Sequence, residues 1–130
     1  MSNGKKISRV IYLILCVLFA SGVIMQVILA GMAIFINGLH WAQHSTLIHL
    51  FGFNIPIFML IAAFLGKMPR WAYWHVFGLL FLIFLMYFTA NITGTFPIVA
   101  ALHPVIAMAL FMFSLWMVFK AWRFSFKKEC

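Results

Sequence analysis

The chain has 130 residues, of which 67% are hydrophobic and only 8% are charged. A soluble domain has roughly a quarter charged residues, so we expect lipid rather than water to be the solvent of a single small domain. The net charge of +8 comes from nine basic residues that flank apolar runs. This distribution argues against a nucleic-acid-binding stripe and indicates charges that set membrane topology.

The first apolar run predicts a transmembrane helix over about residues 10–36. This run is longer than the roughly 20 residues that cross the hydrocarbon, so the helix should tilt or protrude. Asn37-Gly38 ends it, and an uncharged loop follows that contains His40 and His44. These two histidines are four residues apart, so they would share a face and could bind a metal if the loop were helical; an exposed polar loop is the simpler interpretation.

Three further spans follow, over about residues 46–65, 72–92 and 98–119. The segment 66–70, Gly-Lys-Met-Pro-Arg, stops the second span with a glycine, a proline and two cations. The turn 93–97 ends with a proline, which suits the first turn of the last helix. Pro56 and Pro104 each remove one helix hydrogen bond, so they predict local kinks.

The basic residues predict the orientation, because all nine lie at the N-terminus, in the second loop or in the C-terminal tail. The positive-inside rule then places both termini in the cytoplasm and the protein in the plasma membrane. Short loops make neighbouring helices antiparallel. The predicted fold is therefore all-α: one integral membrane domain over residues 1–130, an up-down-up-down four-helix bundle with both ends inside.

The rest of the composition excludes several kinds of chemistry. The only acidic side chain is Glu129 in the tail, which excludes paired-carboxylate catalysis and carboxylate proton relays within the membrane. Cys16 and Cys130 should lie too far apart for a disulfide, and Cys130 should face a reducing compartment. The tail residues Lys127 and Lys128 could contact anionic lipid. We therefore favour a protein that is not an enzyme, and histidine is the remaining functional side chain.

Two of the five histidines are predicted to lie inside the membrane at similar depth. His49 is about three residues from the outer end of its helix and His103 about five, which places both about 5–8 Å below that end. A polar imidazole in lipid usually points into the bundle. One interpretation is a structural hydrogen bond between helices; the other is a ligand site. His75 should instead lie at the inner interface.

Small residues flank these two histidines and could leave room for a flat cofactor. They are Gly52 near His49, Ala100 and Ala107 near His103, and Gly31 at a matching depth of the first helix. Histidines on facing helices of a bundle commonly hold haem iron. His49 and His103 would give a six-coordinate, low-spin haem b suited to electron transfer. Gln26 and Asn54, near mid-membrane, could bond to one another or contact a haem edge or a quinone.

Three short stretches resemble haem A synthase, which consists of two four-helix bundles in tandem. The run from Gln26 to Gly31 is similar to its Gln-x-x-Leu-Gly stretch, and residues 101–104, Ala-Leu-His-Pro, are similar to its Ala-x-Leu-His-Gln stretch. His49 resembles the haem ligand of that family's second helix. The chain looks like one half of such a protein, and it is also similar to small bacterial four-helix membrane proteins grouped as a domain of unknown function.

Two departures separate the chain from haem A synthase. Thr46 stands where the family has a glutamate, three residues before the histidine, and the family's cysteine pair in an outer loop is missing. The resemblance therefore implies the haem-holding bundle without the haem-modifying reaction. We expect a cytochrome b-like protein whose partners are lipid and a quinone or another redox protein, with no nucleic acid; a homodimer would mimic the tandem family. The alternatives are a non-enzymatic accessory protein with structural histidines and, less favoured without intramembrane charge, a small transporter or immunity-type protein.

Overall fold

The computed structural model describes residues 2–126, which contain helices and no strands. Four helical segments are long and apolar enough to cross a membrane: Asn3–Phe35, His40–Leu65, Arg70–Asn91 and Pro97–Phe126. The predicted all-α membrane protein is therefore confirmed at the level of its four helices. Residues 127–130, with both tail lysines, Glu129 and Cys130, lie outside the described residues, so the expectations for them are not tested.

The first and third spans are single helices, α1 (Asn3–Phe35) and α4 (Arg70–Asn91). The second is broken into α2 (His40–Phe51) and α3 (Asn54–Leu65), and the fourth into α5 (Pro97–Ala100) and α6 (His103–Phe126). The helix α2 begins earlier than residue 46, so the segment expected to be a loop around His40 and His44 is helical instead.

Each break lies just before a proline. Pro56 has no N–H for the carbonyl of Gly52, and Pro104 has none for the carbonyl of Ala100, because a helical N–H bonds the carbonyl four residues earlier. The kinks expected at both prolines are therefore present, as interruptions on the N-terminal side of each proline. His49 consequently lies in the last turn of α2, and His103 is the first residue of α6.

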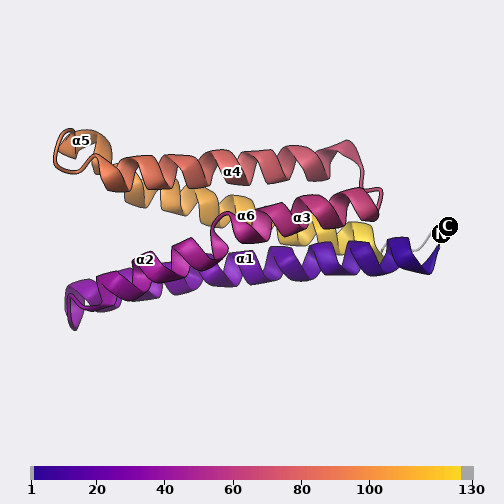
Figure 1. Cartoon of the computed structure of the whole chain (residues 1–130), viewed down its shortest axis with the longest axis horizontal. Helices are drawn as coiled ribbons and strands as arrows, with labels where there is room; N and C mark the ends of the chain where they lie inside the picture. The colour runs from indigo at the N-terminus through magenta and orange to yellow at the C-terminus, as the bar shows by residue number, and fades with distance from the viewer. Residues whose placement is uncertain (1, 127–130) are drawn as a thin grey trace.

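The helices α1, α3, α4 and α6 form the bundle, in which α1 packs against α3 and α6, and α4 packs against the same two helices. The short α2 packs mainly against α1. Figure 1 shows successive spans running in opposite directions, with the first turn of α1 near the last turns of α6. This end also holds the loop between α3 and α4. We call it the basic end, because every lysine and arginine between residues 2 and 126 lies in the first two turns of α1, the last two turns of α6 or the segment 67–70; the other is the uncharged end.

The core is aliphatic and aromatic, and it holds the helices by side-chain packing. Tyr12, Phe19, Met59 and Ile83 are completely buried, and they come from three different helices. Large apolar side chains cover the outer surface of every span; examples are Phe64, Phe81 and Phe119. A helix that is apolar on its outside as well as its inside suits a lipid solvent.

Candidate functional site

Four polar side chains from four helices gather in the half of the bundle toward the uncharged end. We call them the polar cluster: Gln26 of α1, His44 of α2, Thr89 of α4 and His103 of α6. Hydrogen bonds join α1 to α2 and α4 to α6 within it. Polar groups in an apolar bundle are costly unless they are paired, so this cluster is the first candidate for a functional site.

His44 and Gln26 bond to each other's backbone. The amide Nε2 of Gln26 donates to the carbonyl of His44 at 3.0 Å, and Nδ1 of His44 lies 3.0 Å from the carbonyl of Gln26. A carbonyl oxygen only accepts, so the proton of His44 is assigned to Nδ1. The lone pair of Nε2 is therefore free in the neutral ring.

For His103 we also assign the ring proton to Nδ1. Its Nδ1 lies 2.9 Å from Oγ1 of Thr89. That hydroxyl has one proton, which is directed to the carbonyls of Leu85 and Met86, at 2.8 and 3.1 Å. Thr89 therefore accepts from Nδ1–H of His103, and the lone pair of His103 is also on Nε2.

His44 is bonded to α1 and His103 to α4, in the same half of the bundle. No hydrogen bond to Nε2 of either ring occurs within residues 2–126. The third member, Gln26, is 8% exposed, and its Oε1 is buried without a partner among those residues. The site thus presents two imidazole lone pairs on α2 and α6 and one unpaired amide oxygen on α1.

His49, which the sequence paired with His103, lies elsewhere. Its ring is exposed, and its Nδ1 lies 3.0 Å from the hydroxyl of Tyr87, whose ring stacks on Phe53. Tyr87 and Thr89 are two residues apart in α4, so they point about 200° apart around its axis. His49 and His103 are therefore held by partners on different faces of α4.

Gln26 and Asn54 do not bond to one another. Asn54 is exposed, and its amide donates to the carbonyl of Leu50 at 2.7 Å, within its own span. Gly52 lies at the break between α2 and α3, where a Cβ would come within 2.7 Å of the carbonyl of Ile48. The glycine is thus needed for the bent backbone.

The remaining small residues differ in the space around them. Ala100 is buried, whereas Ala107 and Gly31 are half-buried. A Cβ added to Gly31 would meet nothing within 4 Å. The backbone of Gly31 is therefore not in close contact with a neighbouring helix on the side to which a Cβ would point.

The sequence paired His44 with His40 rather than with His103, and it did not single out Thr89. His44 was placed in an exposed loop and compared with His40, whose Nδ1 in fact lies 2.6 Å from Oε1 of Gln43. One feature of the sequence could have shown that this segment is helical. His40, His44 and Ile48 are each four residues apart, which is the spacing of one face of a helix. Thr89 carried no signal, because a threonine in a membrane helix most often bonds its own backbone.

A polynuclear or three-ligand metal centre is not present in the part of the chain that the structure describes. No group of three or more His, Cys, Asp or Glu side chains with a suitable arrangement occurs within residues 2–126. Any metal chemistry at the polar cluster would therefore use two imidazoles. Two axial histidines are the protein ligands of a six-coordinate haem.

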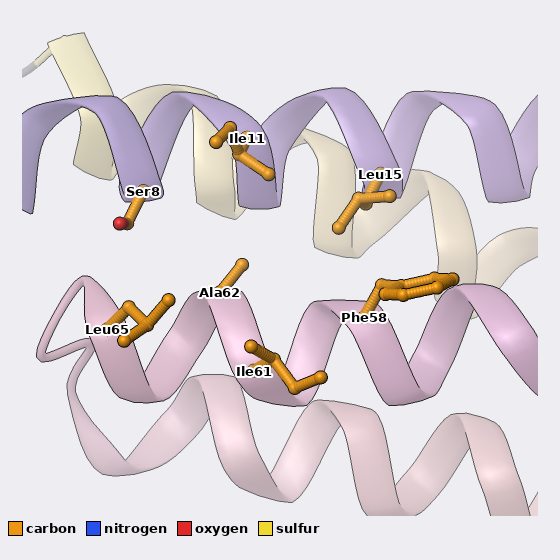
Figure 2. Close-up of a pocket in the computed structure, with 7 residues that line it drawn as sticks. All are labelled: Ser8, Ile11, Leu15, Phe58, Ile61, Ala62 and Leu65. Atoms are coloured by element: carbon orange, nitrogen blue, oxygen red, sulfur yellow. The ribbon is translucent and has the colours of Figure 1, made fainter.

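Two surface grooves lie outside the polar cluster. The first, of about 280 Å³, lies between α1 and α3 near the basic end, and Figure 2 shows its mostly apolar lining. It is lined by Ser8, Ile11, Leu15, Phe58, Ile61, Ala62 and Leu65. The second, of about 450 Å³, lies between α1 and α2. Neither combines several polar groups, and both suit contact with lipid chains.

The fold and the polar cluster define a small α-helical membrane protein with buried polar contacts between its helices. Residues 26–94, more than half of the chain, match a family of unknown function, DUF6220. The chain belongs to this family. Comparisons with curated proteins and with solved structures gave no match. The resemblance to haem A synthase therefore remains a hypothesis.

Proposed function

We propose that this chain binds haem b in the half of the bundle toward its uncharged end, where Nε2 of His44 and Nε2 of His103 would hold the iron. The observation that carries the proposal is that Nδ1 of each ring lies within hydrogen-bond distance of an oxygen of the bundle, from which we assign the ring proton to Nδ1. Each ring donates its Nδ1 proton to an oxygen of the bundle and keeps its Nε2 lone pair free. Histidines that bind metals usually donate their other ring N–H in this way, because the hydrogen bond orients the ring and raises its basicity.

The surroundings support a haem as the occupant. The two histidines come from different helices, as in other bundles that hold a cofactor between facing helices. The unpaired Oε1 of Gln26 offers an acceptor for a polar group. Bound haem b with two axial imidazoles would supply one-electron transfer. A quinol dissolved in the bilayer, or a second redox protein, would be the partner.

The orientation belongs to the same proposal. The positive-inside rule places the basic end in the cytoplasm and both termini with it, in the plasma membrane. The polar cluster would then lie in the outer leaflet, where a donor or acceptor on the outer side can reach it.

A second candidate is an accessory protein whose histidines serve only to join helices. The observation that favours it is that His44, His49 and His103 each already have a hydrogen-bond partner on another helix. Such bonds specify helix pairing in a membrane without any cofactor.

The absorption spectrum of protein purified from haem-replete cells separates the two candidates. We expect a Soret band and a sharp α-band after reduction, with stoichiometric haem. His44→Ala and His103→Ala should abolish this spectrum, whereas the matched control His49→Ala should retain it. Loss in His49→Ala with retention in His44→Ala would restore the pairing expected from sequence. A colourless wild-type protein that takes up no added haem would favour the accessory protein.

A further inference from the structure

A second group of aromatic and basic side chains lies between α4 and α6 at the basic end. Trp71 and His75 are four residues apart on α4, and Trp116 and Lys120 are four residues apart on α6, so each pair shares a helix face. The ring of His75 lies 4.5 Å from that of Trp116 and 5.2 Å from that of Trp71, centroid to centroid. We call these four residues the aromatic-basic cluster.

His75 is buried among these side chains, at the end of the bundle where the sequence predicted an interfacial position. The residue is 5% exposed, and its Nδ1 is sealed inside with no hydrogen-bond partner within residues 2–126. Its Nε2 has no partner there either, but it keeps some exposed surface. In the neutral tautomer that carries its proton on Nε2, the ring presents an N–H donor that no group within residues 2–126 accepts from.

Lys120 supplies a cation beside this donor. Its Nζ lies 5.0 Å from the ring centre of Trp71 and 4.9 Å from that of Trp116, and the residue is half-buried. The aromatic faces attract the ammonium but accept none of its three hydrogen bonds fully. No carboxylate side chain occurs within residues 2–126 to neutralise it. The aromatic-basic cluster thus combines the ammonium of Lys120 with the N–H donor of His75.

We propose that the aromatic-basic cluster binds the phosphate of an acidic phospholipid, through Nζ of Lys120 and Nε2–H of His75. An anionic oxygen would satisfy both donors, and charge-assisted bonds of this kind are stronger than neutral ones. His75 lies five residues into α4, about 7.5 Å from the helix start, which is a headgroup depth. Trp74 and Phe119, next in sequence to His75 and Lys120, are exposed, so they can contact the acyl chains.

Native mass spectrometry of the detergent-solubilised full chain tests this proposal. The protein is mixed with equal amounts of phosphatidylglycerol and phosphatidylcholine of the same acyl chains, and bound lipid is counted. We expect preferential binding of one phosphatidylglycerol. Lys120→Gln, which keeps most of the side-chain stem, should lower that binding about tenfold, as the loss of a charged hydrogen bond does. His75→Phe fills the same space without nitrogens and should lower it severalfold.

Arg123→Ala is the matched control, because Arg123 is an exposed cation on the same helix, three residues beyond Lys120. It should change phosphatidylglycerol binding by less than twofold. Circular dichroism checks that every variant remains helical. Lys120→Gln and His75→Phe each remove one donor of the aromatic-basic cluster, from α6 and from α4.

Three results would overturn the proposal. Equal binding of the two lipids would exclude a site for the acidic headgroup. An equal loss in Arg123→Ala would indicate general attraction of anionic lipid to basic charge. Displacement of the lipid by millimolar inorganic phosphate would indicate a free-anion site rather than a lipid site.

Discussion

Gln26 and His44 each direct their side chain to the other's backbone carbonyl, both at 3.0 Å, and so join α1 to α2 with a reciprocal pair of hydrogen bonds. This pair has two consequences. It attaches α2, which has few other neighbours, to the long first helix. It also fixes which nitrogen of His44 carries the proton, and hence which nitrogen is available to a ligand.

Gln26→Leu tests whether the hydrogen bonds between Gln26 and His44 stabilise the attachment of α2 to α1. The variant loses the bond from Nε2 to the carbonyl of His44, but it also removes the unpaired Oε1. Bonds between membrane helices contribute about 0.6–1.7 kcal/mol, so we expect the free energy of unfolding to fall by about 1 kcal/mol. Detergent-to-SDS titration followed by circular dichroism measures it. Asn54→Leu is the control, because Asn54 bonds only within its own span; an equal loss there would contradict this account.

Gly22→Ala tests the contact between α1 and the break in the second span. A Cβ at this position would lie 2.9–3.1 Å from three ring atoms of Phe51. Phe51 is buried and packs edge-on against Phe19, so the ring has little freedom to move. Overpacking of this kind costs about 1–3 kcal/mol, and we expect that loss in the unfolding free energy.

Gly31→Ala on the same helix is the matched control for Gly22→Ala, because a Cβ there meets nothing within 4 Å. It should be neutral or slightly stabilising, since alanine is the better helix former. Phe51→Leu should restore part of the stability of Gly22→Ala. Additive effects of the two substitutions would show that the predicted contact is not what destabilises the variant.

Thr89→Val tests whether the hydroxyl orients His103, and this prediction depends on the proposed haem. Valine has the same shape but cannot accept the Nδ1 proton. Loss of such a partner typically weakens metal binding 10–100-fold, so haem should dissociate faster and the midpoint potential should shift. Thr89→Ser keeps the acceptor and should behave as the wild type. Identical haem retention in Thr89→Val and wild type would argue against the assigned tautomer.

The membrane orientation is testable by labelling single cysteines in intact cells. In a background of Cys16→Ala and Cys130→Ser, an impermeant maleimide should label Gly38→Cys and Gly94→Cys, which lie in the turns of the uncharged end. It should label Arg70→Cys, at the basic end, only after the cells are opened. The reverse pattern would place the termini outside and would move the polar cluster to the inner leaflet.

Local features of the sequence were sufficient to find the four spans and the charged end of the bundle. The length of an apolar run and the positions of lysine and arginine do not depend on tertiary contacts. The same holds for the kinks, because Pro56 and Pro104 remove helix bonds wherever they occur. The start of the second span was missed by several residues, since His40-Trp-Ala-Gln-His-Ser is polar enough to resemble a loop.

The pairing of the histidines could not be predicted in the same way. Depth along a helix follows from residue counting, and it places His49 and His103 at one level. The direction in which each histidine points around its helix axis does not follow from residue counting. These spans are apolar on all sides, so their sequences do not specify which face is inside. The break at Gly52 and the packing of α2 on α1 carry His44 inward and leave His49 exposed at Tyr87.

The sequence by itself determined that this chain has four lipid-suited helices with its basic residues gathered at one end, because hydrophobic length and charge act through the solvent. Only the tertiary structure decided that His44 and His103 keep free Nε2 atoms in one half of the bundle, and that His75 and Lys120 meet between two tryptophans in the other. Those arrangements depend on how each helix is rotated and packed, and rotation is fixed by contacts between residues far apart in the chain.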